Sequence, residues 1–201
     1  MTKGAQKQSS RLSQSGISDV GHQADALSIQ EVENIAVLRL RATSAIDEIH
    51  LQGHDLPDRT GECSGQVPTI LCLRPGEWLV ISETTSGESL LSEYEYTQSD
   101  QQLYSWDQTD GLAMVRLQGP AAHWLMRKNS GLDFHVTSST PDHCAQCRFG
   151  KISVIVHFHR DTEGTGVFDL LMDRSLVRYL WTLLVSTAPH AEELEKGVLP
   201  W

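Results

Sequence analysis

Hydrophobic and polar positions alternate along several stretches of the chain, which is the pattern of strands with one buried face. Residues 32–40 end in such an alternation, and residues 151–159 show it most clearly. One face of the 151–159 segment is apolar and the other mostly polar: the apolar face has Ile152, Val154, Val156 and Phe158, and the polar face has Lys151, Ser153, His157 and His159. Residues 167–172 are predicted to be its antiparallel partner.

Turn signals predict two hairpins in the middle of the chain. Arg74-Pro75-Gly76 is the turn of the first, over 71–82, because proline presets one φ and glycine accepts a positive φ. Thr109-Asp110-Gly111 is the turn of the second, over 102–118. The polar, Gly- and Pro-containing segment 51–66 is predicted to be a loop.

Two helices are predicted before residue 132. The first covers 86–94, with Ser86 as its N-cap. The second begins at Gly119-Pro120, since proline suits the first helical position, and ends near Asn129-Ser130-Gly131, a C-capping sequence. The residues after it, to about Phe149, are predicted to be irregular.

A third helix is predicted near the C-terminus. Asp173 or Ser175 caps it, it runs to about Thr187, and Pro189 closes it. Its apolar arc is wider than packing on one sheet requires, so part of the arc is expected to contact another chain. The arc is formed by Leu176, Val177, Leu180, Trp181, Leu184 and Val185.

The order of these elements predicts an α+β fold. From residue 78 the order is strand, helix, strand, strand, helix, strand, strand, helix, which overlaps two split βαβ (ferredoxin-like) units. We expect antiparallel sheets covered by helices on one side. Residues 1–30 are expected to be a mobile polar basic tail, and residues 31–201 a single domain.

Charge excludes some partners. The chain carries a net charge of -10, and residues 1–18 contain three basic residues and no acid, so the remainder carries -13. Such a body offers no broad basic surface for nucleic acid. No apolar run approaches the roughly 20 residues that span a bilayer, the N-terminus lacks the apolar segment of a signal peptide, and four cysteines are too few for a disulfide scaffold. We expect a cytoplasmic protein that binds neither nucleic acid nor membrane.

Nucleotide-binding and nucleophile motifs are not convincing. The chain has no Gly-rich dinucleotide fingerprint and no phosphate-binding loop, so it is not predicted to be a self-sufficient flavin, NAD or ATP enzyme. Gly61-Glu62-Cys63-Ser64-Gly65 has the spacing of a nucleophile elbow. The preceding residues, 56–60, predict a loop, whereas an elbow needs a buried strand there.

The sharpest chemical pattern is C-x2-C-x9-H-x-H, formed by Cys144, Cys147, His157 and His159. Zinc accepts these ligand types, and both histidines project from one face of the predicted strand, within reach of a loop that carries the cysteines. Because the spacing has no second knuckle, reduced and partly buried thiols are the simpler interpretation. An apolar C-terminal run ending in Trp201 is expected to dock on this chain or on a partner.

Several segments, in order from about residue 70 to 187, together resemble the gamma subunit of heterotetrameric sarcosine oxidase, whose fold is similar to the folate-binding domain of the glycine-cleavage aminomethyltransferase. The segments are Leu73-Arg74-Pro75-Gly76-Glu77-Trp78-Leu79-Val80-Ile81, Val115-Arg116-Leu117-Gln118-Gly119-Pro120-Ala121-Ala122, Gly131-Leu132-Asp133-Phe134-His135, Cys144-Ala145-Gln146, and Phe168-Asp169-Leu170-Leu171 through Arg174-Ser175 to Arg178-Tyr179-Leu180-Trp181. The N-terminal extension and Cys147 depart from the family's pattern.

The resemblance implies an accessory subunit of a flavoenzyme complex. Such a complex oxidatively demethylates sarcosine or a related N-methyl amine, and yields glycine, peroxide and a folate-bound one-carbon unit. The implied partners are large alpha and beta flavoprotein subunits and a small zinc-binding delta subunit. FAD, FMN, NAD and tetrahydrofolate are implied for the partners, and this chain is expected to carry no cofactor and no catalytic residue.

Two other functions stay open from the sequence. One is an autonomous folate-dependent aminomethyltransferase-like protein. The other is a small zinc-binding interaction module built on Cys144, Cys147, His157 and His159.

Overall fold

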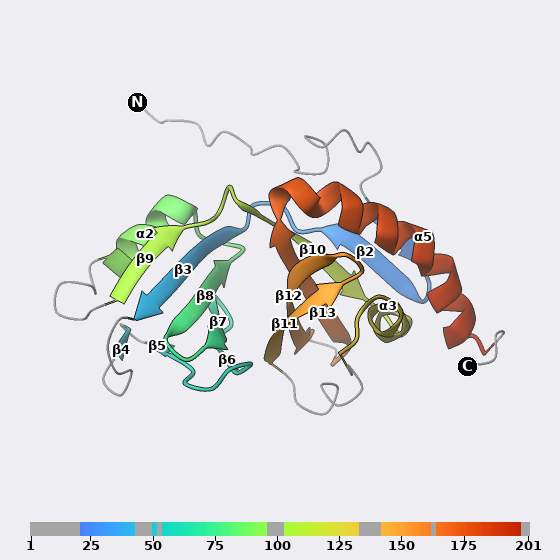
Figure 1. The fold of residues 1–201 in the computed structure, drawn as a ribbon, viewed down its shortest axis with the longest axis horizontal. Helices are drawn as coiled ribbons and strands as arrows, with labels where there is room; N and C mark the ends of the chain where they lie inside the picture. The colour runs from blue at the N-terminus through green and yellow to red at the C-terminus, as the bar shows by residue number, and fades with distance from the viewer. Residues whose placement is uncertain are drawn as a thin grey trace.

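Two antiparallel sheets stacked between helices make up the molecule (Figure 1). The computed structural model describes residues 21–42, 50–51, 54–95, 103–132, 142–161 and 164–197. Helix α2 covers the outside of one sheet, and α3 and α5 cover the outside of the other, so the layer order is helix, sheet, sheet, helix. The predicted α+β class with antiparallel sheets is confirmed.

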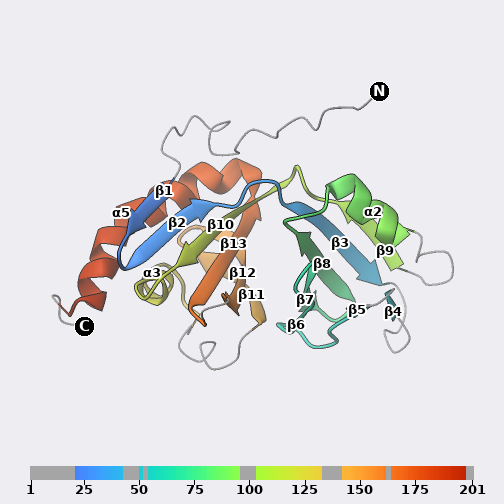
Figure 2. The same cartoon turned by 180° about the vertical axis from the view of Figure 1, so that it is seen from behind.

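The larger sheet has six strands in the order β1-β2-β10-β13-β12-β11, and every neighbouring pair is antiparallel (Figure 2). The strands are β1 (Gly21–Ala24), β2 (Leu27–Glu31), β10 (Leu112–Gln118), β11 (His143–Phe149), β12 (Ile152–Arg160) and β13 (Gly166–Asp173). As predicted, β12 and β13 pair, and the alternation along β12 separates an outer apolar face from an inner polar one.

The smaller sheet has five strands in the order β6-β7-β8-β3-β9. These are β3 (Ala36–Ala42), β6 (Cys63–Ser64), β7 (Thr69–Arg74), β8 (Glu77–Ser82) and β9 (Leu103–Asp107). The hairpin predicted around Arg74-Pro75-Gly76 is confirmed, with Gly76 at φ 78°. A separate pair, β4 (His50–Leu51) and β5 (His54–Asp55), lies in the segment between β3 and β6.

The helices complete split βαβ units. Helix α2 (Gly87–Glu95) joins β8 to β9, which run parallel on either side of β3, and the Ser86 hydroxyl caps it by accepting from Ser89 N at 3.2 Å. In the larger sheet, the chain runs from β10 through α3 (Ala122–Asn129) and the edge strand β11 to β12, and β10 and β12 flank β13. After β13, the 3-10 helix η2 (Arg174–Leu176) leads into α5 (Val177–Glu195), and Asp173 caps η2 by accepting from Ser175 N at 2.8 Å.

Three apolar clusters hold the layers together. One lies between the six-stranded sheet and α3 and α5, the second between the five-stranded sheet and α2, and the third between the two sheets. The third contains residues from both sheets: Val32, Ile35, Val37, Leu71, Leu73, Leu79, Ile81, Met114, Cys144 and Leu171. Among the described residues, no helix has both the length and the apolar character needed to cross a membrane.

The hairpin predicted over 102–118 is wrong, because its two strands belong to different sheets. β9 pairs with β3, whereas β10 pairs with β2 and β13. The turn between them passes the chain from one sheet to the other. Thr109 fixes this passage: its Oγ1 accepts from Val37 N at 3.0 Å, and its own N–H donates to Asp107 Oδ1 at 2.7 Å.

The prediction of an irregular segment up to Phe149 is wrong for residues 143–149, which form β11. This strand is the edge of its sheet, with several side chains partly exposed, so its polar composition resembles a loop. The tail expected over residues 1–30 extends too far, because residues 21–31 form β1 and β2. Leu27 and Ile29 are buried in the core next to the helices. Residues 1–20 of that tail lie outside the described residues.

The last helix also differs from its prediction. It does not stop at Pro189 but continues to Glu195. Proline has no N–H, so one carbonyl of the preceding helical turn has no partner within the helix. Pro189 is exposed, which lets this carbonyl face water. The neighbouring Ala188 and Ala191 stay buried. The core of this chain takes up the broad apolar arc: Val177, Leu180, Trp181 and Leu184 are buried there, and Leu176 and Val185 pack against it. Trp201 lies outside the described residues.

Candidate functional site

A row of polar residues crosses the inner face of the six-stranded sheet. The residues face one another across neighbouring strands: Cys144 pairs with His157, His157 with Asp169, and Asp169 with Arg116. Residues directly opposite in antiparallel strands project from the same face. The pairing of the strands therefore places four polar or titratable side chains between the two sheets.

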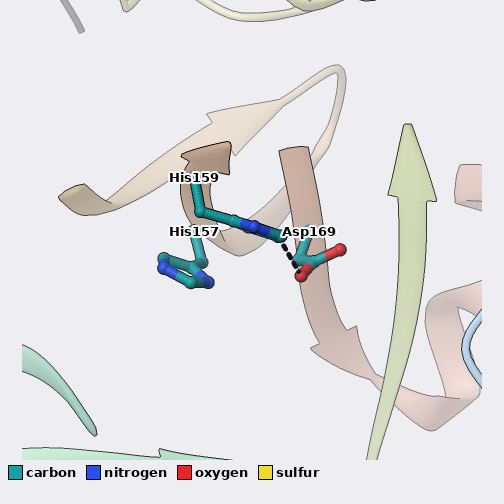
Figure 3. Close-up of side chains that lie close together, drawn as sticks. All are labelled: His157, His159 and Asp169. Atoms are coloured by element: carbon teal, nitrogen blue, oxygen red, sulfur yellow. Dashed lines mark hydrogen bonds and ion pairs between the residues drawn. The ribbon is translucent and has the colours of Figure 1, made fainter. Parts of the chain in front are cut away.

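Asp169, on β13, is the centre of this row. It is 3% exposed. Arg116 on β10 donates to both carboxylate oxygens, from Nε to Oδ1 at 2.7 Å and from Nη2 to Oδ2 at 2.9 Å. His159 on β12 donates from Nε2 to Oδ2 at 2.9 Å (Figure 3). A buried carboxylate is costly unless it is paired and hydrogen-bonded, and these three bonds meet that requirement.

Arg116 also links the two sheets. Its Nη2 donates to Oε1 of Glu83 at 2.6 Å. Glu83 directly follows β8 of the five-stranded sheet, and its side chain is 44% exposed. The guanidinium thus joins a buried carboxylate of one sheet to a half-exposed carboxylate beside the other.

His157 is the member of the row with an unmet hydrogen-bonding group. It is 7% exposed, and its Nε2 is buried with no hydrogen-bond partner among the described residues. Its ring stacks on that of His159, two residues away on the same strand face, at 4.8 Å between centroids and 20° between planes. Buried polar atoms are usually satisfied, so an orphan nitrogen marks a position where something can bind.

The electrostatics of the cluster separate the two histidines. Burial lowers the pKa of His157 to about 4, and the neighbouring His159 adds to this effect. Burial also lowers the pKa of His159, but its hydrogen bond to Asp169 and the negative charge of that carboxylate together outweigh burial and raise the pKa above its ordinary value. Burial raises the pKa of Asp169, and the bonds from His159 and Arg116 outweigh it, so this pKa lies below the usual range. At neutral pH, His157 is a neutral imidazole and Asp169 a carboxylate.

His157, His159 and Asp169 each offer a metal-ligand atom, and these atoms lie within 4.8 Å of one another (Figure 3). Asp169 and Arg116 were missed at the sequence level as site residues. A signal was present, because each is a lone charged residue inside an apolar strand run, Val167–Met172 and Leu112–Leu117. A charge in such a position is either paired or functional.

The structure does not bring the four candidate zinc ligands of the sequence together. Cys144 and Cys147 lie on opposite faces of β11, because they are three positions apart along a strand of period two. Cys144 lies in the cluster between the sheets, with Sγ donating to Cys72 O at 3.5 Å. Cys147 packs against the cluster next to the helices, with its Sγ 3.6 Å from Ser130 Oγ. Of the four, Cys144, His157 and His159 share the inner face.

Cys63, the candidate elbow nucleophile, lies on the short edge strand β6, and the chain leads on from there to β7 rather than to a helix. Its hydrogen bond with Cys144 and its burial raise the pKa of the Cys63 thiol well above the ordinary value. All four cysteines of the chain are free thiols. The structure therefore has no nucleophile elbow at Cys63, in agreement with the sequence analysis, and Cys63 is a protonated thiol at neutral pH.

Comparison with known proteins places the fold. No protein-family model matches the sequence. No curated protein matches it either. Among solved structures, the chain is similar to a chain of heterotetrameric sarcosine oxidase from Corynebacterium sp. U-96, solved in complex with pyrrole 2-carboxylate. The two share 19% sequence identity with a TM-score of 0.76, over 92% of this chain and 97% of that one.

A second similar structure is the glycine cleavage system aminomethyltransferase T from Bartonella henselae, with 12% identity and a TM-score of 0.51. The match covers 80% of this chain and 45% of the transferase, so this chain spans less than half of that enzyme. Both similarities agree with the fold that the sequence resemblance implied. The chain therefore has the fold of a sarcosine oxidase chain, which is related in architecture to part of the aminomethyltransferase.

Proposed function

We propose that this chain is an accessory, structural subunit of a heterotetrameric sarcosine oxidase-like flavoenzyme complex. In this role it corresponds to the gamma subunit and assembles with large alpha and beta flavoprotein subunits and a small zinc-binding delta subunit. The complex oxidatively demethylates sarcosine or a related N-methyl amine to glycine, peroxide and a folate-bound one-carbon unit. FAD, FMN, NAD and tetrahydrofolate belong to the partner subunits in this proposal.

The extent of the structural match carries the proposal. The chain and the sarcosine oxidase chain cover each other almost completely, so the two are of nearly equal length and match as whole units. The aminomethyltransferase is matched over less than half its length. This contrast favours a small subunit of a complex over a complete transferase.

Exposed aromatic side chains on β9 support a role in assembly. Tyr104 is 60% exposed and Trp106 is 38% exposed, and their spacing of two places them on one face of the strand. In the described part of the chain, β9 pairs with β3 alone and is the last strand of its sheet. Aromatic residues are enriched in protein interfaces, so this edge is the proposed contact with a large subunit.

Co-purification tests the proposal. The full-length chain is co-expressed with the large flavoprotein subunits encoded in the same organism, and a tag on this chain is used for purification. We expect flavin absorbance and sarcosine-dependent peroxide formation in the purified fraction. Omission of this chain is expected to reduce the yield of the assembled complex. Recovery of the chain as a monomer, with full oxidase activity in its absence, contradicts the proposal.

Mutation of the β9 face sharpens this test. Trp106→Ser is expected to weaken assembly by about 1–2 kcal/mol, roughly tenfold in affinity, because interface tryptophans contribute disproportionately. Leu132→Ser is the matched control, since Leu132 is 39% exposed and follows α3, outside β9. Equal effects of both substitutions on assembly contradict an interface at β9.

The alternative, an autonomous folate-dependent aminomethyltransferase, is supported by the partial match to aminomethyltransferase T. Calorimetric titration of the isolated full-length chain with tetrahydrofolate distinguishes the two functions. The accessory role predicts no saturable heat, whereas an autonomous transferase predicts saturable binding.

A further inference from the structure

We propose that His157, His159 and Asp169 form a binding site for a divalent transition metal of the zinc type. This site differs from the cysteine-histidine set suggested by the sequence, because Asp169 and the two histidines supply its ligands and neither cysteine does. The proposal concerns this chain's own residues and does not depend on its assembly with other subunits.

The ligand types and their placement support this site. Two imidazoles and one carboxylate are ligands that zinc and its neighbours in the transition series accept. All three side chains project from the inner face of one sheet, on the adjacent strands β12 and β13, and their ligand atoms lie within 4.8 Å of one another (Figure 3). Rigid adjacent strands hold ligands more precisely than loops do.

His157 supplies the observation that points to a ligand. The residue is 7% exposed, and its Nε2 is buried and has no hydrogen-bond partner among the described residues. A buried polar nitrogen without a partner destabilises the folded protein. A bound metal ion would accept the lone pair of this nitrogen and remove that cost.

The surrounding charges accommodate a dication. Arg116 carries one positive charge, and Asp169 and Glu83, which it contacts, carry two negative charges. With both imidazoles neutral, the cluster carries one net negative charge. In the metal-bound form, Arg116 keeps its bond to Oδ1 of Asp169 and orients the carboxylate, which is the usual role of a second layer of hydrogen bonds around a metal site.

The geometry requires only a small adjustment. Zinc–ligand distances of about 2.0–2.2 Å in a tetrahedral site place ligand atoms about 3.4 Å apart. Atoms as far as 4.8 Å apart therefore have to approach one another by about 1.4 Å. His159 exchanges its hydrogen bond to Oδ2 for the metal, and the His157 ring has to turn about its Cβ–Cγ bond to bring Nε2, which lies on the side of the ring away from Asp169, to the same point (Figure 3). Three protein ligands leave a fourth position for water.

Metal titration of the full-length, untagged chain tests the site. Protein freed of metal with a chelator is titrated with Zn²⁺ in competition with a chromophoric chelator. We expect one equivalent to bind, with a rise in the thermal midpoint that follows the free Zn²⁺ concentration. His157→Leu and His159→Gln are each expected to weaken binding at least tenfold. Two variants are used so that the test still holds if one of them fails to fold. Thermal unfolding of each variant shows whether it is folded.

Two control variants separate this site from its alternatives. Cys147→Ser removes a ligand of the cysteine-histidine pattern, and His190→Gln removes a histidine of α5, outside the cluster. Both are expected to bind Zn²⁺ with unchanged affinity. Substitution with Co²⁺ is expected to give visible absorption bands without thiolate-to-cobalt charge transfer. Absence of saturable binding, unchanged binding in His157→Leu, or loss of binding in Cys147→Ser overturns the proposal.

Discussion

Each sheet buries one carboxylate on its inner face, and the two sheets pair it differently. In the five-stranded sheet, Glu77 is 3% exposed and is held by Arg39 and Arg74. In the six-stranded sheet, Asp169 is equally buried and is held by Arg116 and His159. Burial raises the pKa of Glu77 as it does that of Asp169, and in both cases the cationic partners outweigh burial and hold the pKa low.

The difference lies in the second partner. Arginine is charged at every pH that a folded protein experiences, so both partners of Glu77 are permanent. Histidine changes charge near neutrality, so one partner of Asp169 depends on pH. A second histidine, His157, lies beside the Asp169 cluster, and its Nε2 has no hydrogen-bond partner within the part of the chain that the structure describes. The two clusters meet the same electrostatic requirement, but only the Asp169 cluster can respond to protons or a metal.

Removal of an arginine from each cluster gives the largest expected difference. Arg116→Met leaves Asp169 buried with only a titratable partner, and is expected to destabilise the protein by about 3–5 kcal/mol, as for other broken buried ion pairs. Arg39→Met leaves Glu77 with the permanent charge of Arg74, and is expected to cost about 1.5–3 kcal/mol. Urea unfolding at pH 7.5 measures both. An Arg39→Met effect as large as that of Arg116→Met contradicts the assigned asymmetry.

Acid unfolding is the next test. The pKa of His157 is lowered to about 4 in the folded protein from an unfolded value of 6.5. A lowered histidine pKa means that the unfolded chain takes up the proton first, so stability is full above pH 6.5 and falls as pH drops toward 4. This difference in pKa between the folded and unfolded protein corresponds to a loss of about 3 kcal/mol below pH 4.

The His157→Leu variant isolates this contribution. With chelator present, its stability is expected to fall less steeply between pH 6.5 and 4 than that of the unmodified protein, measured by urea unfolding at several pH values. Because the pKa of His159 is raised, its contribution has the opposite sign: it is present below pH 6.5 and is lost as pH rises through the raised value. Parallel pH profiles for the variant and the unmodified protein would show that His157 is not buried in a neutral state.

The smallest expected effect is at the exposed end of the Arg116 network. Glu83→Gln removes the carboxylate that ties Arg116 to the other sheet, but this side chain is 44% exposed. Partly exposed ion pairs contribute little, so we expect a loss of about 0.5 kcal/mol or less, reduced further by salt. Thermal unfolding at low and high ionic strength measures it. A loss comparable to that of Arg116→Met would mean that the ion pair with Glu83, rather than that with Asp169, dominates this network.

The periodic part of the fold could be predicted from the sequence. The alternation along β12, the turn at Gly76 and the Ser86 cap are local signals, and each occurs where the sequence places it. β11 could not be predicted in this way, because half-exposed polar edge strands have the composition of loops. The passage of the chain between sheets at Thr109 depends on a hydrogen bond to Val37, 72 residues away, which no local window contains.

The candidate site could be predicted only in part. His157 and His159 are identified by their spacing on one strand face. Asp169 joins them through strand pairing, and Arg116 joins Asp169 through the next pairing. Cys147 is a candidate ligand in the sequence because zinc accepts thiols, but the two-residue period of β11 turns it away from the histidines. Strand register therefore decided which residues meet.

The interleaving of the two sheets has a consequence for the order in which the chain can fold during synthesis. All strands of the five-stranded sheet come from one continuous stretch, 36–107, whereas β1 and β2 of the six-stranded sheet precede it and the rest follow from residue 112. As the chain leaves the ribosome, β2 with its apolar Leu27 and Ile29 has to wait for β10 before it gains a partner strand beyond β1. Chains whose synthesis stops once the five-stranded sheet is complete therefore expose the hydrophobic edge of β2. These are the chains that a chaperone would have to protect.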